Sequence, residues 1–202
     1  YFEPRGLEAV SALKLTPVVH YAEHISMLES ARLPAPLDVY LKFNTGMNRL
    51  GFDARDGASA TSAYERLKAA TNVAQLTLMI HLANADRADG ASGPAEVAEQ
   101  LAVLQSVAGQ WPERRSFANS AALFLRPEVK GDSVRPGIAL YGAATDDSRS
   151  AAQLGIEPAM TLKSRLIAMQ TLKPGAVVGY GSRFAAPRLM RIGVVACGYA
   201  DG

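Results

Sequence analysis

The sequence has one cysteine in 202 residues, Cys197, and so it cannot close an intramolecular disulfide. A disulfide-rich secreted scaffold is therefore excluded, and we expect a reducing compartment. No apolar run approaches the roughly 18 residues that span a bilayer, and no signal peptide is visible. The sequence therefore predicts a cytoplasmic protein that does not enter a membrane.

An excess of either charge is also missing. The chain carries 21 Lys and Arg against 19 Asp and Glu, scattered along its length, for a net charge of +2. A nucleic-acid or anionic-membrane partner would need a basic footprint, so neither is predicted. What is present is 49% hydrophobic residues, enough to build a globular core.

The two ends lack features of a natural domain. The sequence opens at Tyr1 without a methionine, and it closes in a turn directly after the apolar run 191–197. A strand edge without its continuation leaves backbone groups unpaired. We therefore expect a fragment that is cut at both ends.

Short apolar strands alternate with helical patterns through the first three quarters of the chain. Strands are predicted over 16–21, 37–43, 75–82, 116–121 and 137–141, and helices over 23–32, 58–70 and 94–108. Repetition of strand and helix at this pitch predicts parallel β/α units.

The pattern changes after Pro158, where apolar residues alternate and turn residues separate them, which predicts antiparallel strands. The predicted fold class is α/β, a partial (β/α)8 TIM-type barrel followed by the start of a mainly antiparallel β domain. We assign 1–145 to the C-terminal part of the barrel, 146–158 to a linker and 159–202 to the β domain.

The stretch LKFNTGMNRLGF, residues 41–52, organises the predicted site. It begins as a strand and breaks into a loop at Asn44, so Lys42 and Arg49 lie on either side of a strand-to-loop transition. Parallel α/β proteins place reactive groups at the carboxyl ends of their strands. An ordinary strand and turn with two solvated basic residues would look the same.

Polar residues lie near the ends of the next strands in the same way. The strand 75–82 delivers His81 near its end and Asp86 after a turn, and the strand 116–121 delivers Ser120. The next segment delivers Arg135, directly before Pro136 and Gly137. Each has an ordinary structural reading: His81 could be a core histidine and Ser120 a helix cap. Their arrival at successive strand ends favours a shared site.

A phosphate cradle is one function that this arrangement could serve. The hydroxyl of Ser120 would lie near the bare amides of Gly137 and Ile138 in the adjacent loop, and such groups bind phosphate. Barrels often hold phosphates in their last loops. Gly137 could equally be a turn glycine.

Six motifs occur in a characteristic order: KFNTGMNRLG, HLANAD, FANSAA, RPGIALYG, VVGYGSRF and GYADG. In these motifs the chain resembles the fold-type III alanine racemases, over essentially its whole length. The resemblance implies an isomerase that uses pyridoxal 5′-phosphate (PLP) to interconvert L-alanine and D-alanine, for peptidoglycan supply or for catabolism. It also implies a head-to-tail homodimer with shared active sites.

The resemblance assigns cofactor roles to four residues. Arg135 resembles the arginine that faces the pyridine nitrogen, and a permanently charged guanidinium would keep that nitrogen unprotonated and weaken the electron sink. Ser120, with the amides of Gly137 and Ile138, resembles the phosphate clamp.

The same resemblance implies that Arg49 contacts the phenolic oxygen of the cofactor and the substrate carboxylate. Lys42 matches a lysine that is carbamylated in some relatives and so positions Arg49. Without the modification a lysine would repel the neighbouring arginine, so this hypothesis is chemically sensible.

Tyr180 resembles the catalytic tyrosine, contributed by the partner subunit, which acts opposite a lysine because racemisation needs one base on each face of Cα. A tyrosine with a pKa of about 10 is a poor base at neutral pH, so a cationic neighbour must help it. His81 with Arg135 is the implied relay. Tyr199 and Asp86 match residues that line the substrate entrance.

The chain departs from the family pattern at Asn44, where aspartate is frequent, and at Asn48, where glycine is common. More seriously, the Schiff-base lysine of the family is expected upstream of Tyr1. None of the lysines of the chain lies in the matching motif: Lys14, Lys42, Lys68, Lys130, Lys163 and Lys173. We therefore predict that these residues alone are inactive and poorly stable.

Two alternatives stay open. One is an amino-acid racemase of broader specificity, or a decarboxylase on the same fold, although decarboxylases lack the RPGIALYG and GYADG contexts. The other is a non-catalytic PLP-binding barrel, against which Tyr180 and the stretch 160–202 speak, because such carriers resemble the barrel alone. No metal site is predicted.

Overall fold

The computed structural model describes residues 3–87, 96–129, 131–145 and 148–201. Its chain separates into two compact units, Tyr1–Ala159 and Met160–Gly202. In the described part of the chain, no helix has the length and apolar character to cross a membrane.

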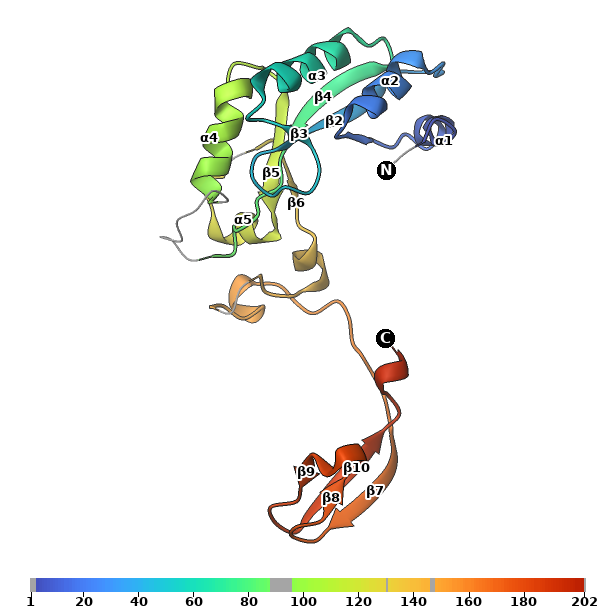
Figure 1. Cartoon of the computed structure of the whole chain (residues 1–202), viewed down its shortest axis with the longest axis vertical. Coiled ribbons are helices and arrows are strands. Elements are labelled where there is room, and N and C mark those ends of the chain that lie inside the picture. Colours follow the sequence, from blue (N-terminus) through green and yellow to red (C-terminus); the bar gives the residue numbers. More distant parts are fainter. Residues whose placement is uncertain (1–2, 88–95, 130, 146–147, 202) are drawn as a thin grey trace. The chain divides into compact units, whose positions relative to one another are not determined.

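The first unit is built on a six-stranded sheet whose path runs β1-β2-β4-β5-β6, with β3 paired to β2 beside that path (Figure 1). The strands are β1 (Val18–Val19), β2 (Leu37–Asn44), β3 (Phe52–Asp53), β4 (Val73–Met79), β5 (Arg114–Asn119) and β6 (Ser133–Arg135). Every pairing in this sheet is parallel. Consecutive parallel strands with helical connections form the wall of a β/α barrel, as predicted.

Five helices accompany these strands: α1 (Gly6–Ala12), α2 (Ala22–Ser30), α3 (Gly57–Ala69), α4 (Val97–Ala108) and α5 (Ser120–Leu125). α2, α3 and α4 lie along one face of the sheet, and α3 packs against both of the others (Figure 1). The core runs between these layers. Leu41 of β2 and Leu78 of β4 are register partners with 0% exposure, and each such leucine stabilises the fold by about 1.5–3 kcal/mol.

Most predicted elements are present. The strands predicted over 37–43 and 75–82 are β2 and β4, and the helices predicted over 23–32 and 58–70 are α2 and α3. The helix predicted over 94–108 is α4, although residues 94 and 95 lie outside the described residues.

The prediction of a strand over 137–141 is wrong. This stretch contains the 3-10 helix η1 (Ile138–Tyr141), and the strand is β6, which ends at Arg135. Pro136 has no N–H to continue a ladder, and Gly142 ends the helical turn with φ at +73°.

The strand predicted over 116–121 ends early, because the side chain of Asn119 accepts a hydrogen bond from the Ala122 N–H at 3.0 Å and so begins α5. Helix α1 was not predicted at all, since its short sequence, GLEAVSA, carries little periodicity.

The second unit is antiparallel, as predicted. β7 (Leu166–Leu172) pairs with β10 (Met190–Val195), and β8 (Val177–Val178) pairs with β9 (Phe184–Ala185) around the 3-10 helix η3 (Tyr180–Ser182). The remaining short helices are η2 (Ala152–Leu154), in the first unit, and η4 (Tyr199–Asp201). Among the described residues of the second unit, only Ala186 is buried. Two-stranded sheets without a core are marginally stable by themselves.

Gly51 lets the loop that leaves β2 return along the same strand. Its φ is +121°, and a Cβ at this position would lie 2.6 Å from the Asn44 nitrogen and 2.9 Å from the Lys42 carbonyl oxygen. No other residue type fits so close to a backbone. The loop that carries Arg49 therefore depends on this glycine.

In a full-length protein that contains these residues, we expect Gly51→Ala to lower the free energy of unfolding. Backbone strain alone accounts for about 1–3 kcal/mol of this loss. Gly57→Ala is the matched control, because Gly57 begins α3 and the nearest atom to an added Cβ is 4.0 Å away. Equilibrium denaturation measures both. Equal midpoints for the two variants would contradict the close approach.

Candidate active site

A cavity of about 470 Å³ lies where β4, β5 and β6 end, with Met47 of the loop after β2 also in its wall. Its lining includes six of the residues predicted for the site: His81, Asp86, Ser120, Arg135, Gly137 and Ile138. They come from three separate strand ends, and the parallel pairing of the sheet collects them at one edge.

Arg135 is held across the strand ends by three hydrogen bonds. Its Nη1 donates to the Ser116 carbonyl oxygen and to the Ser116 Oγ, both at 2.7 Å, and its Nη2 donates to the Ile80 carbonyl oxygen at 2.6 Å. Burial lowers the pKa of Arg135, but a guanidinium keeps its charge at neutral pH. The site therefore contains a fixed positive charge.

The residues predicted to form a phosphate cradle, Ser120, Gly137 and Ile138, line the same cavity, but their amides differ from the prediction in one respect. Ser120 is buried, and its Oγ accepts a hydrogen bond from the Ala139 N–H at 3.2 Å. The Gly137 N–H is not bare, because it donates to the Arg135 carbonyl oxygen at 2.9 Å. The Ile138 N–H has no acceptor among the described residues. A Cβ on Gly137 would meet no atom within 4 Å, so open space adjoins its backbone.

His81 is uncharged at neutral pH. Burial is the largest cause that lowers its pKa, to about 4, and the positive charges of Arg135, Arg49 and Lys42 lower it further. The prediction paired His81 with Arg135 as a cationic neighbour for a tyrosine base. In the structure only Arg135 of this pair supplies charge, so His81 can act as a neutral hydrogen-bonding group.

Lys42 is 8% exposed within β2, whereas Arg49 is exposed in the loop that follows. Burial lowers the pKa of Lys42, and the charges of Arg49 and Arg135 lower it further. Neither Lys42 nor Arg49 is among the residues that line the cavity. Their charges nevertheless act on His81, so the site is electropositive.

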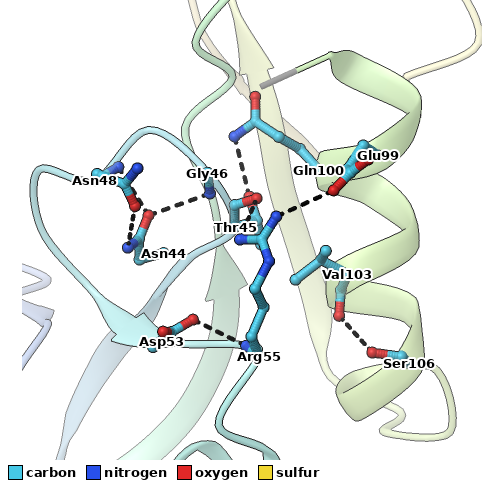
Figure 2. Close-up of polar contacts among 10 residues, drawn as sticks. All are labelled: Asn44, Thr45, Gly46, Asn48, Asp53, Arg55, Glu99, Gln100, Val103 and Ser106. Atoms are coloured by element: carbon cyan, nitrogen blue, oxygen red, sulfur yellow. Dashed lines mark hydrogen bonds and ion pairs between the residues drawn. The ribbon is translucent and has the colours of Figure 1, made fainter. Parts of the chain in front are cut away.

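The two departures from the family pattern bind each other (Figure 2). Asn44 Nδ2 donates to Asn48 Oδ1 at 3.0 Å, and Asn44 Oδ1 accepts from the N–H groups of Gly46 at 3.2 Å and Asn48 at 2.9 Å. Asn48 has φ of +55°, a conformation that glycine adopts freely and asparagine tolerates. This explains why asparagine can replace a glycine here.

Gln100 was missed by the sequence reasoning. It is fully buried on α4 beside Val97 and Leu104, and it hydrogen-bonds Thr45, as Figure 2 shows, as well as the backbone of His81. A polar residue on the apolar stripe of a helix was the available signal.

Tyr180 and Tyr199 belong to the second unit, and both side chains are fully exposed. Tyr180 opens η3 between two glycines in the left-handed region, Gly179 at φ +70° and Gly181 at φ +72°. In the described part of the chain, no three His, Cys, Asp or Glu side chains gather closely enough to hold a metal ion.

Two family models match nearly the whole chain: "Alanine racemase, N-terminal domain" over residues 1–145 and "Alanine racemase, C-terminal domain" over residues 159–202. The alanine racemase of Ralstonia nicotianae is 45% identical over all of this chain and 52% of its own length. The chain thus spans about half the length of the curated relatives it matches.

Solved structures agree with these matches. A biosynthetic alanine racemase from Pseudomonas aeruginosa superposes with a TM-score of 0.87 at 38% identity, over 100% of this chain and 54% of the other. An alanine racemase from Bartonella henselae, described with covalently bound pyridoxal phosphate, has a TM-score of 0.68 at 24% identity, over 99% and 54%. These likenesses confirm the predicted fold class.

The lowered pKa of His81 makes stability depend on pH. Between its ordinary value of 6.5 and about 4, the unfolded chain binds a proton that the folded chain does not. The free energy of unfolding therefore falls as pH decreases through this window. His20 and His24, whose pKa values are also lowered, contribute in the same direction.

We expect the free energy of unfolding of His81→Gln to fall less than that of the parent between pH 7 and pH 4. Denaturation curves of both proteins across this range measure the difference. NMR titration of the imidazole that disappears in the variant gives the pKa directly. A midpoint near 6.5 for that ring would contradict the burial argument.

Proposed function

The chain belongs to the alanine racemase family, and from this premise we propose that the protein containing it interconverts L-alanine and D-alanine with PLP as cofactor. The observation that carries the proposal is the cavity of about 470 Å³, which collects Arg135, Ser120 and His81 from successive strand ends. The solved relative described with covalently bound pyridoxal phosphate supports the choice of cofactor.

The residues present fit an anionic, phosphate-bearing cofactor. The Ser120 hydroxyl and the Ile138 N–H would hold the phosphate, and the open space beside Gly137 leaves it room. The positive charges of Arg49 and Arg135 favour an anion in this place.

Arg135 would face the ring nitrogen of the cofactor. Its Nη1 and Nη2 atoms bind the backbone of Ser116 and Ile80, which fixes the guanidinium and leaves other N–H groups to donate. When bound, PLP supplies an electron sink for charge at the substrate Cα. A charged donor at its nitrogen would weaken that sink and so suppress transamination.

Two bases are required for inversion at Cα. Tyr180, contributed by the partner subunit of a homodimer, would remove or return the proton on one face, and a lysine outside these 202 residues would serve the other. The full exposure of Tyr180 suits a residue that reaches another subunit. Arg135 would supply the charge that makes this tyrosine a better base, with neutral His81 as the hydrogen-bonding link.

Three further residues would handle the substrate. Arg49 would bind its carboxylate, and Asp86 and Tyr199 would line its entrance. Asp86 lies in the cavity wall, which supports its assignment. The cellular role that follows is supply of D-alanine for peptidoglycan, or its breakdown, in the cytoplasm.

Tyr180→Phe in a full-length enzyme that contains these residues tests the function. The equilibrium between enantiomers forces racemisation to slow equally in both directions, by about 10²–10⁴-fold for loss of a general base. The remaining lysine should still exchange the α-hydrogen of one enantiomer with solvent, without inversion. Deuterium incorporation into recovered L- and D-alanine measures this.

Tyr64→Phe is the matched control, because it also removes one tyrosine hydroxyl, which donates to Glu113 at 2.9 Å. It should change the rate of racemisation in neither direction. Absence of turnover in the parent enzyme would identify a non-catalytic PLP carrier. Faster racemisation of larger amino acids than of alanine would favour the broad-specificity alternative.

Lys42 is proposed to carry a carbamate. Burial lowers the pKa of its amine, which favours the neutral form. A neutral amine attacks the carbon of CO2, forming an N–C bond as a C–O π bond opens and a proton is released. The product is an anion that would attract Arg49 instead of repelling it.

Incubation with ¹³C-labelled bicarbonate should give one carbamate carbon signal by NMR, and Lys42→Arg should remove it. Lys68→Arg is the control, since Lys68 is an exposed partner of Glu113 and should not affect the signal. A spectrum without that signal, or one unchanged by Lys42→Arg, would refute the modification.

A further inference from the structure

Gln100 is a buried amide on an otherwise apolar helix face. Its exposure is 0%, and the other buried residues of α4 are Val97, Leu104 and Ala108. Burying a side-chain amide costs free energy unless hydrogen bonds replace those to water. The burial of Gln100 must therefore be offset by the hydrogen bonds that its side chain makes.

Those partners lie on two different strand-end segments. Gln100 Nε2 donates to the Thr45 Oγ1 and to the His81 carbonyl oxygen, both at 3.1 Å, and its Oε1 accepts from the Ala83 N–H at 2.9 Å. One side chain thus bridges the segment after β2 and the segment after β4. Both N–H groups of the amide and its oxygen are used.

Thr45 begins the loop that carries Arg49 and is 1% exposed. A second contact holds the same residue, because Arg55 Nη1 donates to the Thr45 carbonyl oxygen at 3.4 Å and its Nη2 donates to Glu99 at 3.2 Å (Figure 2). The neighbouring residues Glu99 and Gln100 of α4 therefore both restrain Thr45. The Arg55–Glu99 pair is exposed, so its contribution is the smaller one.

The His81 segment is held from two directions. Arg135 binds the carbonyl oxygen of Ile80, and Gln100 binds the carbonyl oxygen of His81 and the N–H of Ala83. Successive backbone groups on both sides of the histidine are therefore fixed. A small shift of this backbone would move the imidazole within the cavity.

We propose that Gln100 is a positioning residue that sets the Arg49 loop and the His81 segment at a fixed separation, acting through Thr45 and the His81 backbone. It touches neither substrate nor cofactor. The catalytic consequence rests on the proposed function, whereas the structural consequence does not. The two can therefore be tested separately.

Amide hydrogen exchange followed by mass spectrometry, on a full-length protein without added substrate, tests the structural part. Gln100→Leu should speed exchange in the peptides that contain 44–51 and 81–84, by about tenfold for one buried hydrogen bond lost. Gln105→Leu is the matched control, because it makes the same change on the exposed side of α4.

Thr45→Val is the second variant, for use if Gln100→Leu does not fold. It is the milder change, because it removes only the hydroxyl that accepts the Gln100 hydrogen bond. It should speed exchange in 44–51 and leave 81–84 near the parent rate, and Thr45→Ser should restore the parent pattern. Exchange that rises equally across the whole chain in Gln100→Leu and Thr45→Val would overturn the proposal and leave Gln100 a packing residue.

Kinetics tests the catalytic part. We expect Thr45→Val to raise the KM for alanine by about tenfold with little change in kcat, because Arg49 is proposed to bind the substrate carboxylate. Glu99→Ala should have a smaller effect. Faster exchange in 44–51 without a change in KM would support the positioning of the loop but refute the assigned role of Arg49.

Discussion

The parallel pairing of β2, β4, β5 and β6 is the constraint on which the site depends. Backbone hydrogen bonds between these strands bring their carboxyl ends to one edge, although the residues there are far apart in the sequence. Arg135 then reaches back over two neighbouring strands to Ser116 and Ile80, which is possible only because those carbonyls lie side by side. The cavity exists because the sheet assembles it, and no single loop could.

Positive charge accumulates at this edge, and it determines the chemistry. Burial is the largest cause of the lowered pKa of His81, and the positive charges of Arg135, Arg49 and Lys42 lower it further, so the ring is neutral at pH 7. An electropositive pocket with few acidic neighbours is most stable when an anion occupies it. A cofactor phosphate, a substrate carboxylate and a carbamate on Lys42 would each neutralise part of this positive charge.

Features that depend on a local sequence pattern were predicted from the sequence. Alternation in 37–43 was enough to find β2, and strand-end positions were enough to nominate His81 and Arg135. The stretch 137–141 failed because its apolar residues resemble a strand, while Pro136 and Gly142 impose a turn. Gln100 could not be given a role because its partners lie 17 to 55 residues away in the sequence, so their meeting depends on the finished fold.

The Asn44–Asn48 contact makes the effect of a substitution at one position depend on the other. Aspartate at position 44 would keep the two contacts to the backbone N–H groups but would lose the donor to Asn48, so Asn48 would have to turn its own amide and donate instead. Glycine at position 48 would remove this side-chain contact altogether and relieve the left-handed backbone. The two positions are therefore epistatic, with a coupling on the order of 0.5–3 kcal/mol. The cost of changing either residue therefore depends on which residue occupies the other position.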